Sequence, residues 1–212
     1  MVYHTVHFRA VAGKDPKGRL LEAAIAHIAG RGVSDLSLRE LAAAIGTSHR
    51  MLIHHFGGRD GLWVEVIRAV EERQRAAFAE VVPEPGATGG DVMRQWWRHI
   101  SDPSLWPNER LFFELYGQAL QGRPGAVALL DGIVDAWLEP AAEGFVAYGL
   151  SRVEALAQAR LGVAISRGLL LDLLATGNRE AVDAAMEAYI DLMERRLAAL
   201  PANPVASSDA AA

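Results

Sequence analysis

Short stretches with helical periodicity, each ended by glycine, are the feature that most limits what this chain can fold into. The first stretch carries apolar residues at helical spacing before Gly30 and Gly32, namely Leu20, Leu21, Ala24, Ile25 and Ile28. Asp15 and Pro16 suit its start as cap and first-turn residue. Patterns typical of strands are scarce along the whole sequence, which therefore predicts an all-α fold.

Two further short helices follow directly. Ser37 with Glu40 three residues later forms the capping-box pattern, and Gly46 ends the helix that it starts. Ser48 can cap a third helix, which the pair Gly57-Gly58 ends. Residues 15–60 are therefore predicted to form a compact three-helix head.

The remainder of the chain is predicted to be helical as well. Asp60 can cap a fourth helix that reaches about Val81, and a linker rich in proline and glycine extends from Pro83 to Gly90. Periodicity and glycine breaks then predict helices near residues 91–101, 108–121, 125–148, 151–176 and 178–199.

This pattern predicts four segments. They are an N-terminal arm at 1–14, a helix-turn-helix domain at 15–60, a ligand-binding and dimerisation domain at 61–200, and a flexible tail at 201–212. There is no cysteine, which excludes disulfides and cysteine-based metal sites. No apolar run approaches the roughly 20 residues of a membrane span, and no signal-peptide pattern is present. We therefore expect a cytoplasmic protein without a membrane partner.

Charge is distributed unevenly. The chain has a formal net charge of -5, yet residues 1–60 hold eight Lys and Arg against five Asp and Glu, a net +3. Residues 61–212 therefore carry a net −8. Six of the seven histidines also lie in the first sixty residues. A basic head on an acidic body is typical of a protein whose head faces a polyanion.

Two short helices joined by a glycine-containing turn form a helix-turn-helix, whose second helix can lie in the DNA major groove. Arg50 is the best candidate for guanine, because a guanidinium matches its two acceptors. His49 and His54 could donate to bases or phosphates. The predicted DNA-binding residues are Ser37, Arg39, Thr47, Ser48, His49, Arg50, Ile53, His54, His55 and Arg59.

Over about residues 17–65 the sequence resembles the TetR/AcrR family of bacterial transcriptional regulators. The motifs that carry the resemblance are Gly32, Ser37-Leu38, Leu41-Ala42, Gly46-x-Ser48, Leu52-x-x-His55-Phe56, Arg59 and Leu62. The chain departs from the family at Ile53, where tyrosine is usual, and at Arg59, which replaces a lysine. The resemblance implies an all-helical homodimer that binds a palindromic DNA operator, usually as a repressor, and that a ligand in the larger domain releases.

Aromatic residues are concentrated in the predicted larger domain, where they favour either a core or an apolar ligand cavity. Trp96 and Trp97 are adjacent on a helix, so that one is expected to face the cavity and the other to pack elsewhere. The predicted ligand-binding residues are Trp96, Trp97, His99, Phe113, Tyr116, Gln118, Trp137 and Arg167.

The last two predicted helices each carry an apolar stripe. Two such helices from each of two subunits would form a four-helix bundle, whereas the alternative is that both stripes pack inside one chain. The predicted dimer interface consists of Leu161, Ile165, Leu169, Val182, Met186, Tyr189, Met193 and Leu197.

These features together favour a ligand-responsive, DNA-binding regulator. Its expected partners are an operator duplex, a second copy of the chain and a small apolar or aromatic effector. One alternative is a helical protein-interaction module that does not bind DNA. Another is a small helical enzyme that uses the aromatic cavity, although no catalytic constellation supports it. No cofactor is expected, and His49 with His54 lacks the further ligands that a zinc site needs.

Overall fold

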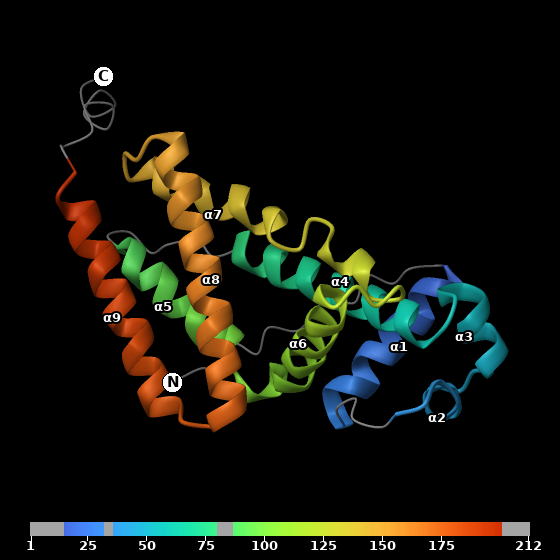
Figure 1. Ribbon diagram of the computed structural model, residues 1–212. Coiled ribbons are helices and arrows are strands. Elements are labelled where there is room, and N and C mark those ends of the chain that lie inside the picture. The colour runs from blue at the N-terminus through green and yellow to red at the C-terminus, as the bar shows by residue number, and fades with distance from the viewer. Residues whose placement is uncertain (1–14, 32–35, 80–86, 201–212) are drawn as a thin grey trace, which may run out of the picture.

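The computed structural model describes residues 15–31, 36–79 and 87–200, and the regular structure within them is entirely helical (Figure 1). The head consists of α1 (Pro16–Arg31), α2 (Leu38–Ala44) and α3 (His49–Phe56). The long helix α4 (Arg59–Ala79) leads from the head into the body. The body holds α5 (Gly89–Ile100), η1 (Pro103–Leu105), α6 (Trp106–Leu120), η2 (Val127–Leu130), α7 (Asp135–Ala147), α8 (Arg152–Thr176) and α9 (Arg179–Ala198).

Side-chain caps fix both short helices of the head, as the sequence predicts. The Ser37 hydroxyl accepts the Glu40 backbone N–H at 3.2 Å, and the Ser37 N–H donates to the Glu40 carboxylate at 2.9 Å. The Ser48 hydroxyl accepts the Met51 backbone N–H at 3.2 Å. Gly57 ends α3 with a φ of 74°, a left-handed conformation that glycine adopts without strain.

The hydrophobic core of the head is continuous with part of the body. Ile28, Leu41 and Leu52 are fully buried, one from each head helix. The same cluster includes buried side chains along α4 and, from α6, Leu111 and Leu115. The head therefore shares its hydrophobic core with α4 and α6. A movement of α4 would change the packing of the head directly.

A loop after α6 fixes the start of α4. Asp60 lies in the first turn of α4 and not at the cap position that we predicted, because the helix already begins at Arg59. Its carboxylate pairs with Arg123 at 3.3 Å. Gly125 packs so closely that a Cβ there would lie 2.5 Å from the Asp60 side chain. Arg68, further along α4, donates to the carbonyl of Ala128 in η2 at 2.6 Å.

The predicted linker is too long at its C-terminal end. Gly89 and Gly90 belong to α5, which Thr88 caps together with Asp91. Gly90 lies against α9, where a Cβ would come within 3 Å of the side chains of Ile190 and Glu194. These glycines therefore serve close helix packing and do not extend the linker.

The predicted helix over 125–148 is also wrong. The chain forms the short η2 turn, then Gly132 with a φ of 70°, and only then α7. The left-handed glycine breaks the continuous helix that the apolar pattern indicates.

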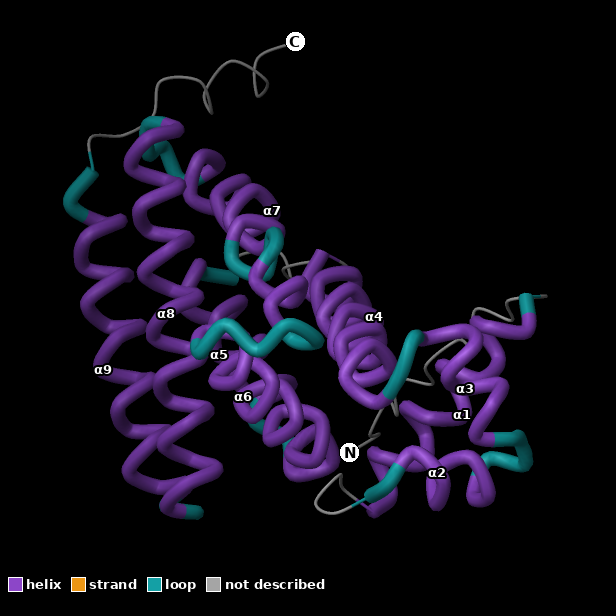
Figure 2. Tube along the Cα trace, turned by 45° about the vertical axis from the view of Figure 1, so that its right-hand side comes forward, coloured by secondary structure: helices purple, strands orange, loops and turns teal. Residues whose placement is uncertain are grey.

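The last two helices agree closely with the prediction. Ser151 caps α8 with Glu154 in a capping box, and Gly177 ends it with a φ of 66°. Helix α9 then returns beside α8, and both views place the pair at the end of the body farthest from the head (Figures 1 and 2).

The arm at 1–14 and the tail at 201–212 lie outside the described residues. The division into domains at residue 60 stays a prediction. None of the described helices is long and apolar enough to cross a membrane.

Candidate functional site

Helix α3 presents a polar outer face on an apolar base. Leu52 is fully buried and Phe56 is buried beneath the helix. Arg50 and His54 are exposed, and so is Ile53, with 43% of its surface accessible. No ion pair engages Arg50 or His54 within the part of the chain that the structure describes. The face that α3 turns outward is therefore free to contact a partner.

The other predicted DNA-binding residues surround this face. Arg39 and Arg59 are exposed, whereas Thr47 and His49 are half-buried. The Ser37 and Ser48 hydroxyls are exposed but already accept cap hydrogen bonds, so each retains its own O–H as a donor.

His55 also turns partly inward. Its Nε2 is buried without a hydrogen-bond partner among the described residues, and its ring lies edge-on to that of Phe56 at 6.3 Å. DNA contact by the set as a whole remains a prediction.

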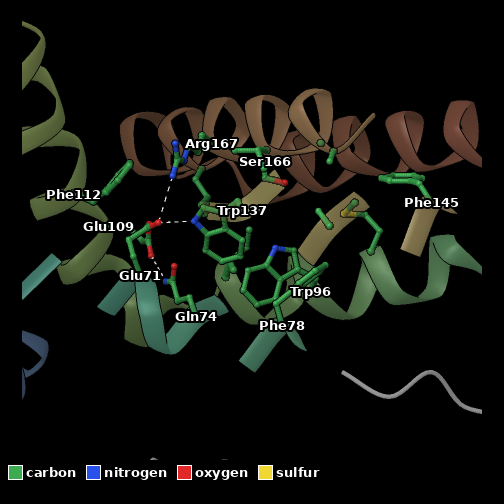
Figure 3. Close-up of a pocket in the computed structure, with 17 residues that line it drawn as sticks. Glu71, Gln74, Phe78, Trp96, Glu109, Phe112, Trp137, Phe145, Ser166 and Arg167 are labelled. Atoms are coloured by element: carbon green, nitrogen blue, oxygen red, sulfur yellow. Dashed lines mark hydrogen bonds and ion pairs between the residues drawn. The ribbon is translucent and has the colours of Figure 1, made fainter. Parts of the chain in front are cut away.

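A cavity of about 70 Å³ lies inside the body (Figure 3). Helices α4, α5, α6, α7 and α8 supply its walls. Polar side chains gather at one end and aromatic rings line the rest. The residues that line it are Glu71, Gln74, Phe78, Met93, Trp96, Ile100, Glu109, Phe112, Trp137, Ala141, Phe145, Ala159, Gly162, Val163, Ser166, Arg167 and Leu170.

Glu71 is the centre of the polar end, and 6% of its surface is exposed. The indole N–H of Trp137 donates to its carboxylate at 2.6 Å. Arg167 and Arg75 pair with the same oxygen at 3.4 and 3.9 Å. Burial raises the pKa of Glu71, and Arg167 is the strongest of the partners that oppose the rise. The charge of Glu71 is thus compensated inside the chain.

Glu109 lies beside Glu71 but is compensated differently. It is 5% exposed and accepts a hydrogen bond from the Gln74 amide at 2.7 Å. No arginine, lysine or histidine of the described residues lies within ion-pair distance of it. Burial raises the pKa of Glu109 to about 7, and the neighbouring Glu71 charge adds to the rise. With a pKa of about 7, both the protonated and the ionised form of this carboxyl are populated near neutral pH.

Arg167 is fully engaged at this end of the cavity. Besides Glu71, it donates to the Ile133 carbonyl at 2.8 Å. Its guanidinium lies over the Phe112 ring, 5.0 Å from the centroid. The aromatic part continues away from it, with the Trp96 and Trp137 centroids 5.5 Å apart and Phe145 at the opposite end (Figure 3).

Three of the eight predicted ligand-binding residues line this cavity, namely Trp96, Trp137 and Arg167. Trp97, the neighbour of Trp96, turns away and donates to Asp183 on α9 at 2.8 Å, because adjacent helical residues face different sides. Gln118 is half-buried and bonds to Glu114 one turn back on α6.

The remaining three lie elsewhere as well. Phe113 packs between two core clusters, and Tyr116 stacks on Phe112 at 5.4 Å. His99 lines a second cavity, of about 390 Å³, between the head helix α1 and the body. Burial lowers the pKa of His99, which favours the neutral imidazole. Gln74 lines both cavities and so forms part of the wall between them.

Sequence reasoning missed the two glutamates and Gln74. Glu71, Gln74 and Phe78 continue the inward face of α4 set by Ile67, at spacings of three and four residues. A charged residue at a position that the periodicity assigns to the interior was the available signal. Glu109 gave the same signal, since it lies three residues before Phe112 on the buried face of α6.

The predicted dimer stripe on α9 is corrected by the structure. Val182, Met186, Tyr189 and Met193 are all buried in the core clusters of this one chain, because α9 turns that face toward α5 and α8. Ile165, Leu169 and Leu197 are half-buried against the same clusters, so that only Leu161 faces outward.

Other residues form the outer face of α8 and α9. It combines exposed large apolar side chains with small residues at intervals of three and four. On α8 these are Val153, Ala157, Leu161, Ala164, Gly168 and Leu171, and on α9 they are Ala181, Ala185, Ala188 and Leu192.

No group of three or more potential metal ligands occurs in residues 15–31, 36–79 and 87–200.

The first part of the chain is similar to a known protein family. Residues 20–66 match the family model described as "Bacterial regulatory proteins, tetR family". The head of the chain belongs to the TetR family. The match spans the three head helices and the first part of α4, where the predicted DNA-binding residues lie.

Solved structures of TetR-family regulators share the whole fold. A transcriptional regulator from Rhodococcus sp. Rha1 is 20% identical with a TM-score of 0.70, and the match covers 88% of this chain and 100% of that one. A TetR regulator from Legionella pneumophila is 18% identical with a TM-score of 0.64, covering 85% and 97%. The multidrug binding protein EbrR, complexed with imidazole, is 27% identical with a TM-score of 0.58, covering 89% and 94%. Comparison with curated protein sequences gives no match.

Proposed function

We propose that this TetR-family chain is a transcriptional repressor that binds a DNA operator through α3. The single observation that carries the proposal is the outward face of α3, where Arg50, Ile53 and His54 stand free above the buried Leu52. An arginine in that position can bind guanine with two hydrogen bonds in the major groove. The caps at Ser37 and Ser48 hold the two helices in the fixed relation that such contacts require.

The repressor acts as a homodimer on a palindromic operator. The outer face of α8 and α9 supports this, because Val153, Leu161, Leu171 and Leu192 are large apolar residues that one chain leaves in water. The small residues between them let two helix pairs approach closely as a four-helix bundle. Two α3 helices about 34–36 Å apart then reach successive major grooves.

A small molecule in the body cavity releases the operator. Glu71 and Gln74 of α4 form part of the cavity wall, and the same helix begins three residues after the end of α3. The free volume of about 70 Å³ is well below the roughly 300 Å³ of typical ligand sites. A ligand must therefore favour a wider arrangement, and it weakens DNA binding by its differential affinity for that arrangement. EbrR, a multidrug binding protein of the same fold, was crystallised with imidazole, which supports a ligand of small organic type.

The experiment is a selection of duplexes from a randomised pool, followed by fluorescence anisotropy titrations of the selected duplex. We expect two chains per duplex and an affinity that falls steeply with salt concentration, because phosphate contacts release counterions. Arg50→Ala combined with His54→Ala should weaken binding by at least about tenfold to a hundredfold and relax the sequence preference, since the bidentate base contact of Arg50 alone contributes about 1–3 kcal/mol.

The matched control is Arg152→Ala, which removes an exposed arginine at the start of α8, in the body rather than the head. That variant should bind the duplex like the wild type. Unchanged affinity and sequence preference in the double variant of α3 would exclude the proposed DNA-binding face. A stoichiometry of one chain per duplex would exclude the dimer.

A further inference from the structure

The cavity contains one buried carboxyl, that of Glu109, which forms no ion pair with any of the residues that the structure describes. Three ionisable side chains line it, two glutamates and one arginine. The arginine, Arg167, pairs with Glu71 and not with Glu109. Arg75 also pairs with Glu71, so both nearby guanidinium groups serve the same carboxylate. Among the described residues, Glu109 accepts a side-chain hydrogen bond from the neutral amide of Gln74 alone, and Arg167 acts on it from beyond ion-pair distance.

Beyond the polar end that holds Glu109, the walls of the cavity are mainly apolar and aromatic. Phe78, Trp96 and Trp137 lie together, with ring centroids 5.1 to 6.3 Å apart. Aromatic faces attract cations through their quadrupole, and Arg167 over Phe112 already uses this interaction at the polar end. The cavity can thus bind a ligand that combines a flat apolar ring system with a positively charged nitrogen.

We propose that the effector of this regulator is an aromatic organic cation whose protonated nitrogen pairs with Glu109. The inference rests on the proposed function only in treating this cavity as the effector site. A ligand amine replaces the Gln74 amide at the Glu109 carboxylate and supplies the missing positive charge. A charged hydrogen bond of this kind is stronger than the neutral one that it replaces.

An anionic ligand fits the same site poorly. It would meet two carboxylates, while Arg167 is already held by Glu71 and the Ile133 carbonyl. A neutral ligand could share the aromatic walls but would leave the Glu109 charge uncompensated.

Replacement of the Gln74 amide by a ligand amine at Glu109 also makes room for the ligand. Gln74 lies in the wall between the cavity of about 70 Å³ and the second cavity of about 390 Å³. Once its amide is released from Glu109, that wall can open toward the larger space. Ile25 and Ala26 of α1 line the far side of the second cavity, so the head is in contact with the space that a bound ligand enters.

Ionisation of Glu109 gives the proposal a pH dependence. The charged groups around it are Glu71 and Arg75 of α4 and Arg167 of α8. Beyond Gln74, Glu22 of α1, Arg73 of α4 and the neutral His99 of α5 line the second cavity. Segments η1 and η2 contribute no titratable group. The pKa of Glu109 is raised to about 7, so a cation should bind tightly only above that pH.

The test is isothermal titration calorimetry with three probes of one shape, naphthylethylamine, naphthylethanol and naphthylacetate. At pH 8 we expect the amine to bind about tenfold more tightly than the alcohol, and the acetate to bind most weakly. The alkylammonium stays protonated well above pH 8, as that of lysine does. The amine affinity should rise about tenfold between pH 6 and pH 8, as Glu109 ionises.

Glu109→Gln keeps the shape and removes the charge. It should abolish both the preference for the amine and its pH dependence, while the affinity for the alcohol stays within about twofold. The matched control is Glu114→Gln, on the exposed side of the same helix, which should behave like the wild type. The pH profile of the wild-type chain provides the same test without any variant.

Several results would overturn the proposal: equal or tighter binding of the alcohol, an equal loss in both variants, or no binding of any probe. Each leaves the DNA titrations of the proposed function unaffected. Conversely, a chain that binds the amine through Glu109 but no selected duplex would refute the regulator and keep the cation site.

Discussion

The head and the cavity hold similar polar side chains in opposite surroundings. On α3, Arg50 and His54 stand in water without ion-pair partners among the described residues. In the cavity, Glu71 and Arg167 are paired below the surface, and burial raises the pKa of Glu71. The first arrangement suits contact with a large external polyanion, and the second suits a small molecule that must leave water to bind.

This contrast indicates in which region the recognition of a partner is coupled to the free energy of unfolding. An exposed arginine contributes little to folding, so it can be selected for its contacts alone. A buried ionic cluster contributes strongly in either direction, because each charge depends on its partner. The cavity should therefore be the region where a single substitution affects both ligand binding and the free energy of unfolding.

The largest expected effect is that of Glu71→Ala. This change leaves the Arg167 guanidinium and the Trp137 indole N–H buried without their carboxylate. Removing one partner of a buried pair costs about 3–5 kcal/mol. Urea denaturation followed by circular dichroism would measure the loss. A loss below about 1 kcal/mol would mean that the polar end of the cavity is as open to water as α3 is, and the contrast would fail.

The second effect concerns pH. Glu109 has a pKa of about 7 in the folded chain against 4.5 in the unfolded one. The folded chain therefore holds this proton more tightly, so the stability that Glu109 contributes is complete below 4.5 and is lost as pH rises to 7. The loss amounts to about 3 kcal/mol.

The measurement is the difference in unfolding free energy between the wild type and Glu109→Gln, from pH 4.5 to pH 8. Taking the difference removes carboxyls such as Asp91 and Glu154, whose lowered pKa values act in the opposite direction. A difference that does not change with pH would show that Glu109 is solvated like the residues of the head.

The smallest changes in stability are expected for substitutions in the head. Ser48→Ala removes the cap of α3 and should cost about 1 kcal/mol. Arg50→Ala should change stability by less than about 0.5 kcal/mol, since its side chain is exposed. Thermal unfolding of both variants beside the wild type measures these changes. An Arg50→Ala variant that is less stable than Ser48→Ala would place that arginine in the structure of the head and not on its contact surface.

The sequence was informative about the head because its structure is local. The cap Ser37 and its partner Glu40 lie three residues apart, and so do Ser48 and Met51, whose side chains and backbone meet in the folded helix. The outward direction of Arg50 follows from the helical period once Leu52 is assigned to the core.

The cavity could not be predicted in the same way. Glu71 meets Trp137 and Arg167 across 66 and 96 residues of sequence, so the contact depends on how three helices pack. Periodicity indicated that α9 had an apolar stripe but not which neighbour would cover it. The predicted stripe that includes Met186 and Tyr189 is covered by the chain itself, and the exposed face carries alanines that no apolar pattern emphasises.

Tryptophans lie both in the cavity wall and in the core that the body shares with the head. Of the five tryptophans, Trp96 and Trp137 line the cavity, while Trp63 packs in the core shared with the head. Indole emission responds to nearby charges and to water, so the unlabelled chain carries an optical reporter inside each region. Replacing Trp63, or Trp96 and Trp137 together, with phenylalanine would remove the reporter of one region. The order in which the two regions respond to an added compound could then be followed in time, above the emission of Trp97 and Trp106.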